Sequence, residues 1–164
     1  MIMKRIILNP TGMLASGLLL GFLSRLADIY TSNIGNILSQ MAIWILFGVL
    51  ISIYSNSEKE AMLNVLLFCI GMLTAYYSVA FITDGVYSSV FIIGWTVFAF
   101  FSPFLAYFTH ITRRSGILPK IISLGIISFS LLSSIILFDG PRIYDFIIDG
   151  ALAYFLFTKR KKGV

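Results

Sequence analysis

Charge is what this sequence has least of. Only 12% of its 164 residues are Asp, Glu, Lys or Arg, whereas a soluble domain carries about 25%. Hydrophobic residues make up 59%. A soluble domain of this length could not bury so much apolar surface, so lipid must take the place of part of the core. The balance excludes an ordinary soluble fold and predicts an integral membrane protein.

Cysteine and histidine are also scarce, with one residue of each, Cys69 and His110. A single cysteine cannot form an intrachain disulfide, and a lone histidine in a basic segment offers no set of metal ligands. The sequence also lacks a Ser/His catalytic pair, a zinc-binding helix motif and a phosphate-binding loop. We therefore predict a protein that is not an enzyme and that binds no metal and no cofactor.

Apolar segments are what the chain has in abundance. A bilayer core about 30 Å thick needs roughly 20 apolar residues in a helix. Asn9 before Pro10, and Ser57 three residues before Glu60, are typical of helix starts. The fold class predicted is all-α, with one transmembrane domain over residues 1–164 and a polar loop at 28–36. Six spans are predicted, at about 10–27, 37–54, 61–82, 88–108, 119–138 and 141–157.

The basic residues predict how these spans are oriented. With six spans, ten Lys and Arg residues fall on one side, whereas only Arg25 and Arg142 fall on the other. Cytoplasmic segments carry such an excess, so both termini should be cytoplasmic in a multi-pass protein of a bacterial inner membrane. Attraction to the lipid bilayer explains the net charge of +5, without a nucleic-acid partner. The ten are Lys4, Arg5, Lys59, Arg113, Arg114, Lys120, Lys159, Arg160, Lys161 and Lys162.

Charged residues gather at the start of the last span. Arg142, Asp145 and Asp149 have i,i+3 and i,i+4 spacing and would share one helix face. Asp149 would lie roughly 10–12 Å past Pro141, below the headgroups. Charges at that depth are costly and usually functional. Arg25, at a comparable depth in the first span, is predicted to pair with Asp149 or Asp145.

Two interpretations of this pair remain open, and a proton-coupled step is a third. The pair could only join the first and last helices. Alternatively, it could belong to an outward-facing polar pocket for a small solute or cation. Two arginines could orient a carboxylate or phosphate, or the aspartates could hold a cationic group. The predicted substrate-binding residues are Arg25, Asp28, Arg142, Tyr144, Asp145 and Asp149.

Small residues mark one face of the first span. Gly17 and Gly21 form a small-xxx-small pair, which allows close approach of another helix. That helix could belong to this chain, so that the glycines serve internal packing. It could instead belong to a partner protein, and then Ala15, Gly17 and Gly21 would form a docking face.

The sequence also resembles two known groups of proteins. One resemblance rests on the segment Gly17-Leu-Leu-Leu-Gly-Phe-Leu-Ser-Arg-Leu-Ala-Asp28, followed by Asn64, Gly71-Met72 and Tyr76-Tyr77. In these residues the chain resembles a family of small bacterial membrane proteins of unknown function. This resemblance covers about the first half of the chain and implies no activity.

The overall plan is similar to that of the substrate-binding S components of energy-coupling-factor vitamin transporters. That resemblance implies six helices, cytoplasmic termini, an outward-facing pocket and a lid formed by residues 28–36. It also implies that Ala15, Gly17 and Gly21 dock to a coupling subunit with its ATPases. The Ala-x-x-x-Ala motif of those proteins is absent, because Leu19 follows Ala15 at that spacing.

The function predicted from these features is that of a small-solute transport component that binds its substrate from the outer face. The alternative is a non-catalytic scaffold or partner subunit, in which the intramembrane charges only join helices.

Overall fold

The computed structural model describes residues 8–83 and 89–158. Within these residues the secondary structure is helical throughout, which confirms the all-α class. The helices are α2 (Pro10–Tyr30), α3 (Ser32–Leu38), α4 (Met41–Tyr54), α5 (Glu58–Ile82), α6 (Ser89–Ile111), α7 (Ile117–Phe138) and α8 (Ile143–Thr158).

Four of these helices are long and apolar enough to cross a membrane: Pro10–Tyr30, Glu58–Ile82, Ser89–Ile111 and Ile117–Leu137. The apolar helix α4 is shorter, with 14 residues, and α8 has 16. At 1.5 Å per residue these two are about 21 and 24 Å long, less than a hydrocarbon core of about 30 Å. The structure thus supports a membrane protein with four candidate spans.

Two helix starts form as their sequences predict. The Asn9 side-chain oxygen accepts a hydrogen bond from the Gly12 backbone N–H at 2.7 Å, and Pro10 occupies the first helical position of α2. The Ser57 hydroxyl likewise accepts from the Glu60 N–H at 3.2 Å. Each cap satisfies a backbone donor that the first turn of a helix leaves free.

The segment expected to be a loop, residues 28–36, is helical instead. Helix α2 continues to Tyr30, and after the extended Thr31 (φ −141°, ψ 103°) the chain turns directly into α3. The two helices meet so closely that a Cβ on Gly35 would lie 2.9 Å from the Asp28 Cα. The prediction of a lid loop was therefore wrong. Polar residues that are typical of a loop in sequence cap and pack a helical turn here.

Helix α8 also begins later than predicted, at Ile143 rather than at Pro141. Asp139 ends α7 in the left-handed conformation (φ 60°), and Gly140 follows with φ 130°. The Asp139 value lies in the left-handed region that aspartate tolerates, whereas the Gly140 value lies in a region open essentially to glycine alone. The turn therefore takes up Pro141 and Arg142 and leaves them outside the helix.

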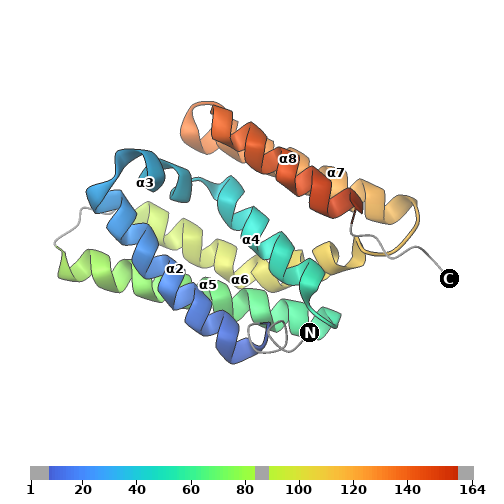
Figure 1. Ribbon diagram of the computed structural model, residues 1–164, viewed down its shortest axis with the longest axis horizontal. Coiled ribbons are helices and arrows are strands. Elements are labelled where there is room, and N and C mark those ends of the chain that lie inside the picture. Colours follow the sequence, from blue (N-terminus) through green and yellow to red (C-terminus); the bar gives the residue numbers. More distant parts are fainter. Residues whose placement is uncertain (1–7, 84–88, 159–164) are drawn as a thin grey trace.

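Helix α4 lies at the centre of the bundle. In Figure 1 it runs between the α2, α5 and α6 group on one side and the α7–α8 hairpin on the other. One face contributes Trp44 and Ile51 to a core with α2, α5 and α6, and the other packs Ala42, Ile45 and Val49 against α8. Apolar residues surround the whole helix because both faces are buried.

Helices α2 and α5 are held together through backbone contact at glycines. A Cβ added to Gly17 would lie 2.2 Å from the Phe68 carbonyl oxygen, and one on Gly21 would lie 2.2 Å from that of Met72. These glycines therefore serve internal packing. The docking interpretation does not fit Gly17 and Gly21, because α5 covers both glycines. Ala15 alone of the three lies exposed.

Large apolar side chains cover the outer surfaces of α6 and α7. Phe100 on α6 is 79% exposed and Ile136 on α7 is 74% exposed. Contiguous apolar surface of this kind is unfavourable in water, whereas hydrocarbon solvates it. The other exposed apolar side chains on these two helices include Val90, Phe91, Ile93, Phe101, Phe104, Phe108, Ile121, Leu124, Phe129 and Leu132.

Candidate functional site

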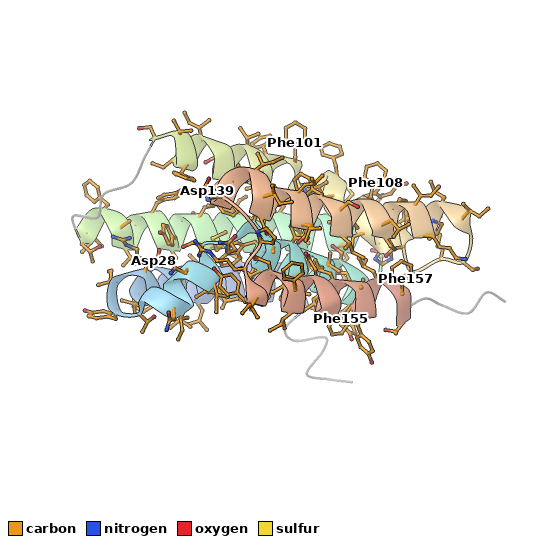
Figure 2. The ribbon with its side chains drawn as sticks, turned by 90° about the horizontal axis from the view of Figure 1, so that it is seen from above. Asp28, Phe101, Phe108, Asp139, Phe155 and Phe157 are labelled. Carbon is orange, nitrogen blue, oxygen red and sulfur yellow. The ribbon has the colours of Figure 1, made fainter. Side chains whose placement is uncertain are left out.

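The aspartates of α2 and α8 lie in two separate polar clusters rather than in one. Figure 2 labels Asp28 of α2 and Asp139 of the α7–α8 turn, and both lie toward the same end of the molecule, whereas Phe108 and Phe157 lie toward the other. We name the two groups after their aspartates. The Asp28 cluster comprises Arg25, Asp28, Ser39 and Tyr76, and the Asp149 cluster comprises Ser130, Asp145 and Asp149.

In the Asp28 cluster a carboxylate joins three helical segments. The Tyr76 hydroxyl of α5 donates to Asp28 Oδ2 at 2.5 Å, and the Ser39 hydroxyl, just after α3, donates to Asp28 Oδ1 at 3.3 Å. The guanidinium carbon of Arg25 lies 5.8 Å from the centroid of the Tyr76 ring, within cation–π range. The Arg25 Nε is buried without a hydrogen-bond partner in residues 8–83 and 89–158.

A cavity of about 560 Å³ opens beside this cluster. Ser39 and Tyr76, the two donors to Asp28, contribute to its wall, as does the buried Ser24. Most of the remaining wall is apolar or aromatic. Its other lining residues are Leu38, Met41, Trp44, Met72, Leu73, Tyr77, Val90, Phe91, Gly94, Trp95 and Leu137.

A second cavity of about 270 Å³ lies deeper, between α4, α5, α6 and α7. Its lining is almost entirely apolar. Trp44, Met72, Leu73 and Trp95 line both cavities, so the two adjoin across these four side chains. Trp44 is fixed there, because its Nε1–H donates to the Leu38 carbonyl at 2.7 Å.

The Asp149 cluster lies between α8 and α7. Asp145 is 0% exposed, Asp149 8% and Ser130 of α7 0%. Asp145 Oδ2 accepts from the Arg142 backbone N–H at 2.8 Å. Its Oδ1, both carboxylate oxygens of Asp149 and the Ser130 hydroxyl are buried with no hydrogen-bond partner in the described part of the chain. The Ser130 hydroxyl lies beside Asp149, and the charge of Asp145 acts on Asp149 through space.

The Arg142 guanidinium bonds to Tyr144 and forms no ion pair with these carboxylates. Its Nη1 donates to the Tyr144 hydroxyl at 2.6 Å, and its guanidinium carbon lies 5.9 Å from the centroid of the Tyr144 ring. The hydrogen bond to Tyr144 raises the pKa of Arg142 above its ordinary value. The side chain of Arg142 is exposed, so this guanidinium does not neutralise the buried carboxylates.

The predicted ion pair between Arg25 and Asp149 or Asp145 is absent. The one ion pair within residues 8–83 and 89–158 joins Arg114 to Glu58, at the opposite end. Helix α2 packs against α5 and α3, whereas α8 packs against α7 and α4, so the helices that carry the predicted partners are not neighbours. The structure brings Arg25 to Asp28, and it groups Arg142, Tyr144, Asp145 and Asp149 elsewhere.

Sequence reasoning missed several cavity and cluster residues. Tyr76, Ser39, Trp44 and Trp95 were not among the predicted substrate-binding residues. One signal was present for Ser130: Ser123, Ser130 and Ser134 follow helical spacing, and all three are buried. Of these three serines only Ser130 lies beside an aspartate of α8, whereas the hydroxyls of Ser123 and Ser134 bond to carbonyls of α7 itself.

Basic residues at the other end of the bundle hold the end of α4. Arg113 Nη1 donates to the Ser55 carbonyl at 2.8 Å, and His110 Nδ1 lies 2.9 Å from the Ser52 carbonyl oxygen. Cations suit the negative end of a helix dipole. Lys4, Arg5 and the basic residues at 159–162 lie outside the described residues. No group of three or more His, Cys, Asp or Glu in the described ranges could hold a metal ion.

Comparison with known proteins gives one match. A family model described as a family of unknown function (DUF6518) matches residues 3–144. The matched stretch contains the whole Asp28 cluster and ends at Tyr144, one residue before Asp145. No curated protein and no solved structure matches the chain.

Proposed function

The chain belongs to this family of unknown function, and from its own geometry we propose that it is a small-solute transport component of a cell membrane. The cavity of about 560 Å³ beside the Asp28 cluster is the observation that carries the proposal. Sites for small molecules are typically concave, mostly apolar and about 300–1,000 Å³ in volume, with a few placed polar groups. The cavity has that size and that lining.

The lining indicates the chemical class of the solute. Trp44, Trp95 and Phe91 offer flat apolar surfaces, and the hydroxyls of Ser39 and Tyr76 offer hydrogen bonds at one end. Asp28 accepts from both hydroxyls and so fixes their directions. The solute is therefore a small, mostly apolar organic molecule with one or two hydrogen-bonding groups. In this proposal Arg25 and Asp28 position the cavity wall.

The proposed topology has six spans, with α4 and α8 as the shorter ones, and cytoplasmic termini. The described basic residues Lys59, Arg113, Arg114 and Lys120 would then lie at the cytoplasmic end. The Asp28 cluster and its cavity would lie at the outer end, so the solute would enter from outside.

The similarity to transporter S components remains a hypothesis within this proposal. A coupling subunit with ATPases would need a docking face other than Gly17 and Gly21, because α5 covers both. The exposed apolar surfaces of α6 and α7 are open to lipid or to such a subunit.

Ligand-dependent melting of the purified protein in detergent tests the solute site. With a panel of vitamins, aromatic carboxylates and amines, we expect a ligand that raises the melting temperature with concentration, as any ligand of the native state does. Tyr76→Phe should weaken the apparent affinity about fivefold, the effect of one lost hydrogen bond of about 1 kcal/mol. Tyr154→Phe is the matched control, since Tyr154 is 59% exposed on α8.

Two outcomes would count against the solute site. One is a broad panel without any shift, and the other is an equal response of the Tyr76→Phe and Tyr154→Phe proteins. Either result would favour the scaffold interpretation, in which the polar clusters only join helices.

Cysteine labelling tests the orientation separately. Cys69, the single cysteine of the sequence, is buried and should not react. Asn36→Cys on α3 and Ser115→Cys between α6 and α7 each place a thiol at an exposed position. In intact cells a membrane-impermeant maleimide should label Asn36→Cys strongly and Ser115→Cys only after permeabilisation. The reverse pattern would mean that the cavity faces the cytoplasm.

A further inference from the structure

Two buried carboxylates of α8 form no ion pair with any residue that the structure describes. Asp145 and Asp149 are 0% and 8% exposed, and three of their four oxygens have no hydrogen-bond partner in the described residues. Burying a charge is costly unless it is paired or coordinates a cation. The cluster therefore requires a positively charged species that the described residues do not supply.

The helices packed against α8 carry no basic group at this level. Helix α4 contains no charged residue, and the only one in α7 is Lys120. Lys120 precedes Ser130 by ten residues, or about 15 Å along the helix. The guanidinium of Arg142 bonds to Tyr144, and Arg25 forms no ion pair with either aspartate. Within residues 8–83 and 89–158 nothing supplies the counter-charge, which points to a cation that binds from outside.

The available ligand atoms are all oxygens. Asp145 Oδ1, Asp149 Oδ1 and Oδ2, and Ser130 Oγ are the buried atoms without a partner on these two helices. Residues at i and i+4 on a helix lie close enough to hold one ion between them. Oxygen ligands of this type suit hard cations. We propose that Asp145, Asp149 and Ser130 form a binding site for one Na⁺ ion.

The ligand set favours Na⁺ over a divalent ion or K⁺. Calcium takes six to eight oxygen ligands and magnesium retains several waters, whereas this buried site offers four side-chain oxygens and no third acidic group within residues 8–83 and 89–158. Ligand number and cavity size select between cations, and four oxygens suit Na⁺ better than the larger K⁺. The two carboxyl groups then share one proton, so that the bound Na⁺ leaves the site neutral. The site is separate from the solute cavity, whose lining contains neither aspartate. The inference is thus independent of the proposed solute.

Melting of the full-length protein in detergent at pH 8 tests the site. NaCl should raise the melting temperature in a saturable way, whereas KCl and choline chloride at equal ionic strength should not. Asp149→Asn should weaken this Na⁺ dependence about tenfold or more, and Ser130→Ala should weaken it less. Asp139→Asn is the matched control, because Asp139 is an exposed carboxylate in the α7–α8 turn. It should respond to Na⁺ as the natural protein does.

Binding of radioactive Na⁺ to the natural protein provides a second measurement that does not depend on any variant's folding. Unlabelled Na⁺ should displace the label, and K⁺ should not. Three results would overturn the proposal: equal stabilisation by all three salts, full Na⁺ dependence in Asp149→Asn, or no displaceable label. Stabilisation that follows pH but not Na⁺ would also overturn it, because the carboxylates would then hold a proton instead.

Discussion

Replacing Gly17 with leucine should prevent α2 from packing on α5, and the protein should be lost as a folded species in detergent. Even the first side-chain atom has no room, because a Cβ would lie 2.2 Å from the Phe68 carbonyl oxygen and 3.1 Å from the Met72 backbone nitrogen. Both contacts are with backbone, which cannot rotate aside as a flexible side chain can. The two helices would have to separate.

The expected loss of stability depends on the other contacts that would loosen if α2 and α5 moved apart. Gly21 and Gly71 also pack against the facing helix. A Cβ added to Gly21 would lie 2.2 Å from the Met72 carbonyl oxygen, and one added to Gly71 would lie 2.5 Å from the Leu14 carbonyl oxygen. Overpacking costs about 1–3 kcal/mol for modest insertions. Gly17→Ala should therefore lower the melting temperature by about 6–12 °C for a cost near 3 kcal/mol. Gly17→Leu should lower the stability by more than Gly17→Ala does, and the protein should give no monodisperse peak in size-exclusion chromatography.

Gly150→Ala is the matched control for this prediction. Gly150 is exposed on α8, and nothing lies within 4 Å of a Cβ added there. Alanine is the better helix former by about 1 kcal/mol, so the melting temperature should stay or rise slightly. An unchanged melting temperature for Gly17→Ala would show that α2 and α5 do not meet at these glycines.

Local sequence signals predicted the helices well and their arrangement poorly. Asn9, Pro10 and Ser57 marked helix starts, because capping depends only on atoms a few residues apart. Helix α3 was missed, since the polar residues around Thr31 satisfy a turn and a helix start equally well. The glycine pair predicted a close helix contact, but the sequence could not identify the opposing helix.

The same limit explains the outcome for the candidate site. Depth along a helix can be counted at 1.5 Å per residue, so Arg25 and the aspartates of α8 were expected at one end of the bundle. Their chain neighbours Asp28 and Asp139 lie toward the same end (Figure 2). Which helices are neighbours depends on the packing of whole faces, and α4 lies between the groups that contain α2 and α8. The burial of Asp145 and Asp149 followed from the cost of exposing carboxylates to lipid. An ion pair with Arg25 could not be derived in the same way, because it also requires α2 and α8 to be neighbours.

Replacing Gly94 with phenylalanine should abolish solute binding and leave the fold intact. Gly94 of α6 lines the cavity of about 560 Å³, and nothing lies within 4 Å of a Cβ added there. A phenylalanine ring can therefore enter space that a solute would need, next to Trp95 and Phe91. The ring gains apolar contacts with the cavity wall, so the melting temperature without ligand should not fall.

For any ligand found in the melting panel, we compare the concentration that gives half of the maximal shift in melting temperature. This concentration should be at least about a hundredfold higher for the Gly94→Phe protein than for the natural protein. Gly150→Phe adds the same ring at an exposed position on α8 and should bind as the natural protein does. Because both variants gain identical side chains, a difference between them reports on the cavity rather than on general hydrophobicity. Equal binding by both would place the solute outside this cavity, and the aromatic wall around Gly94 would then serve packing alone.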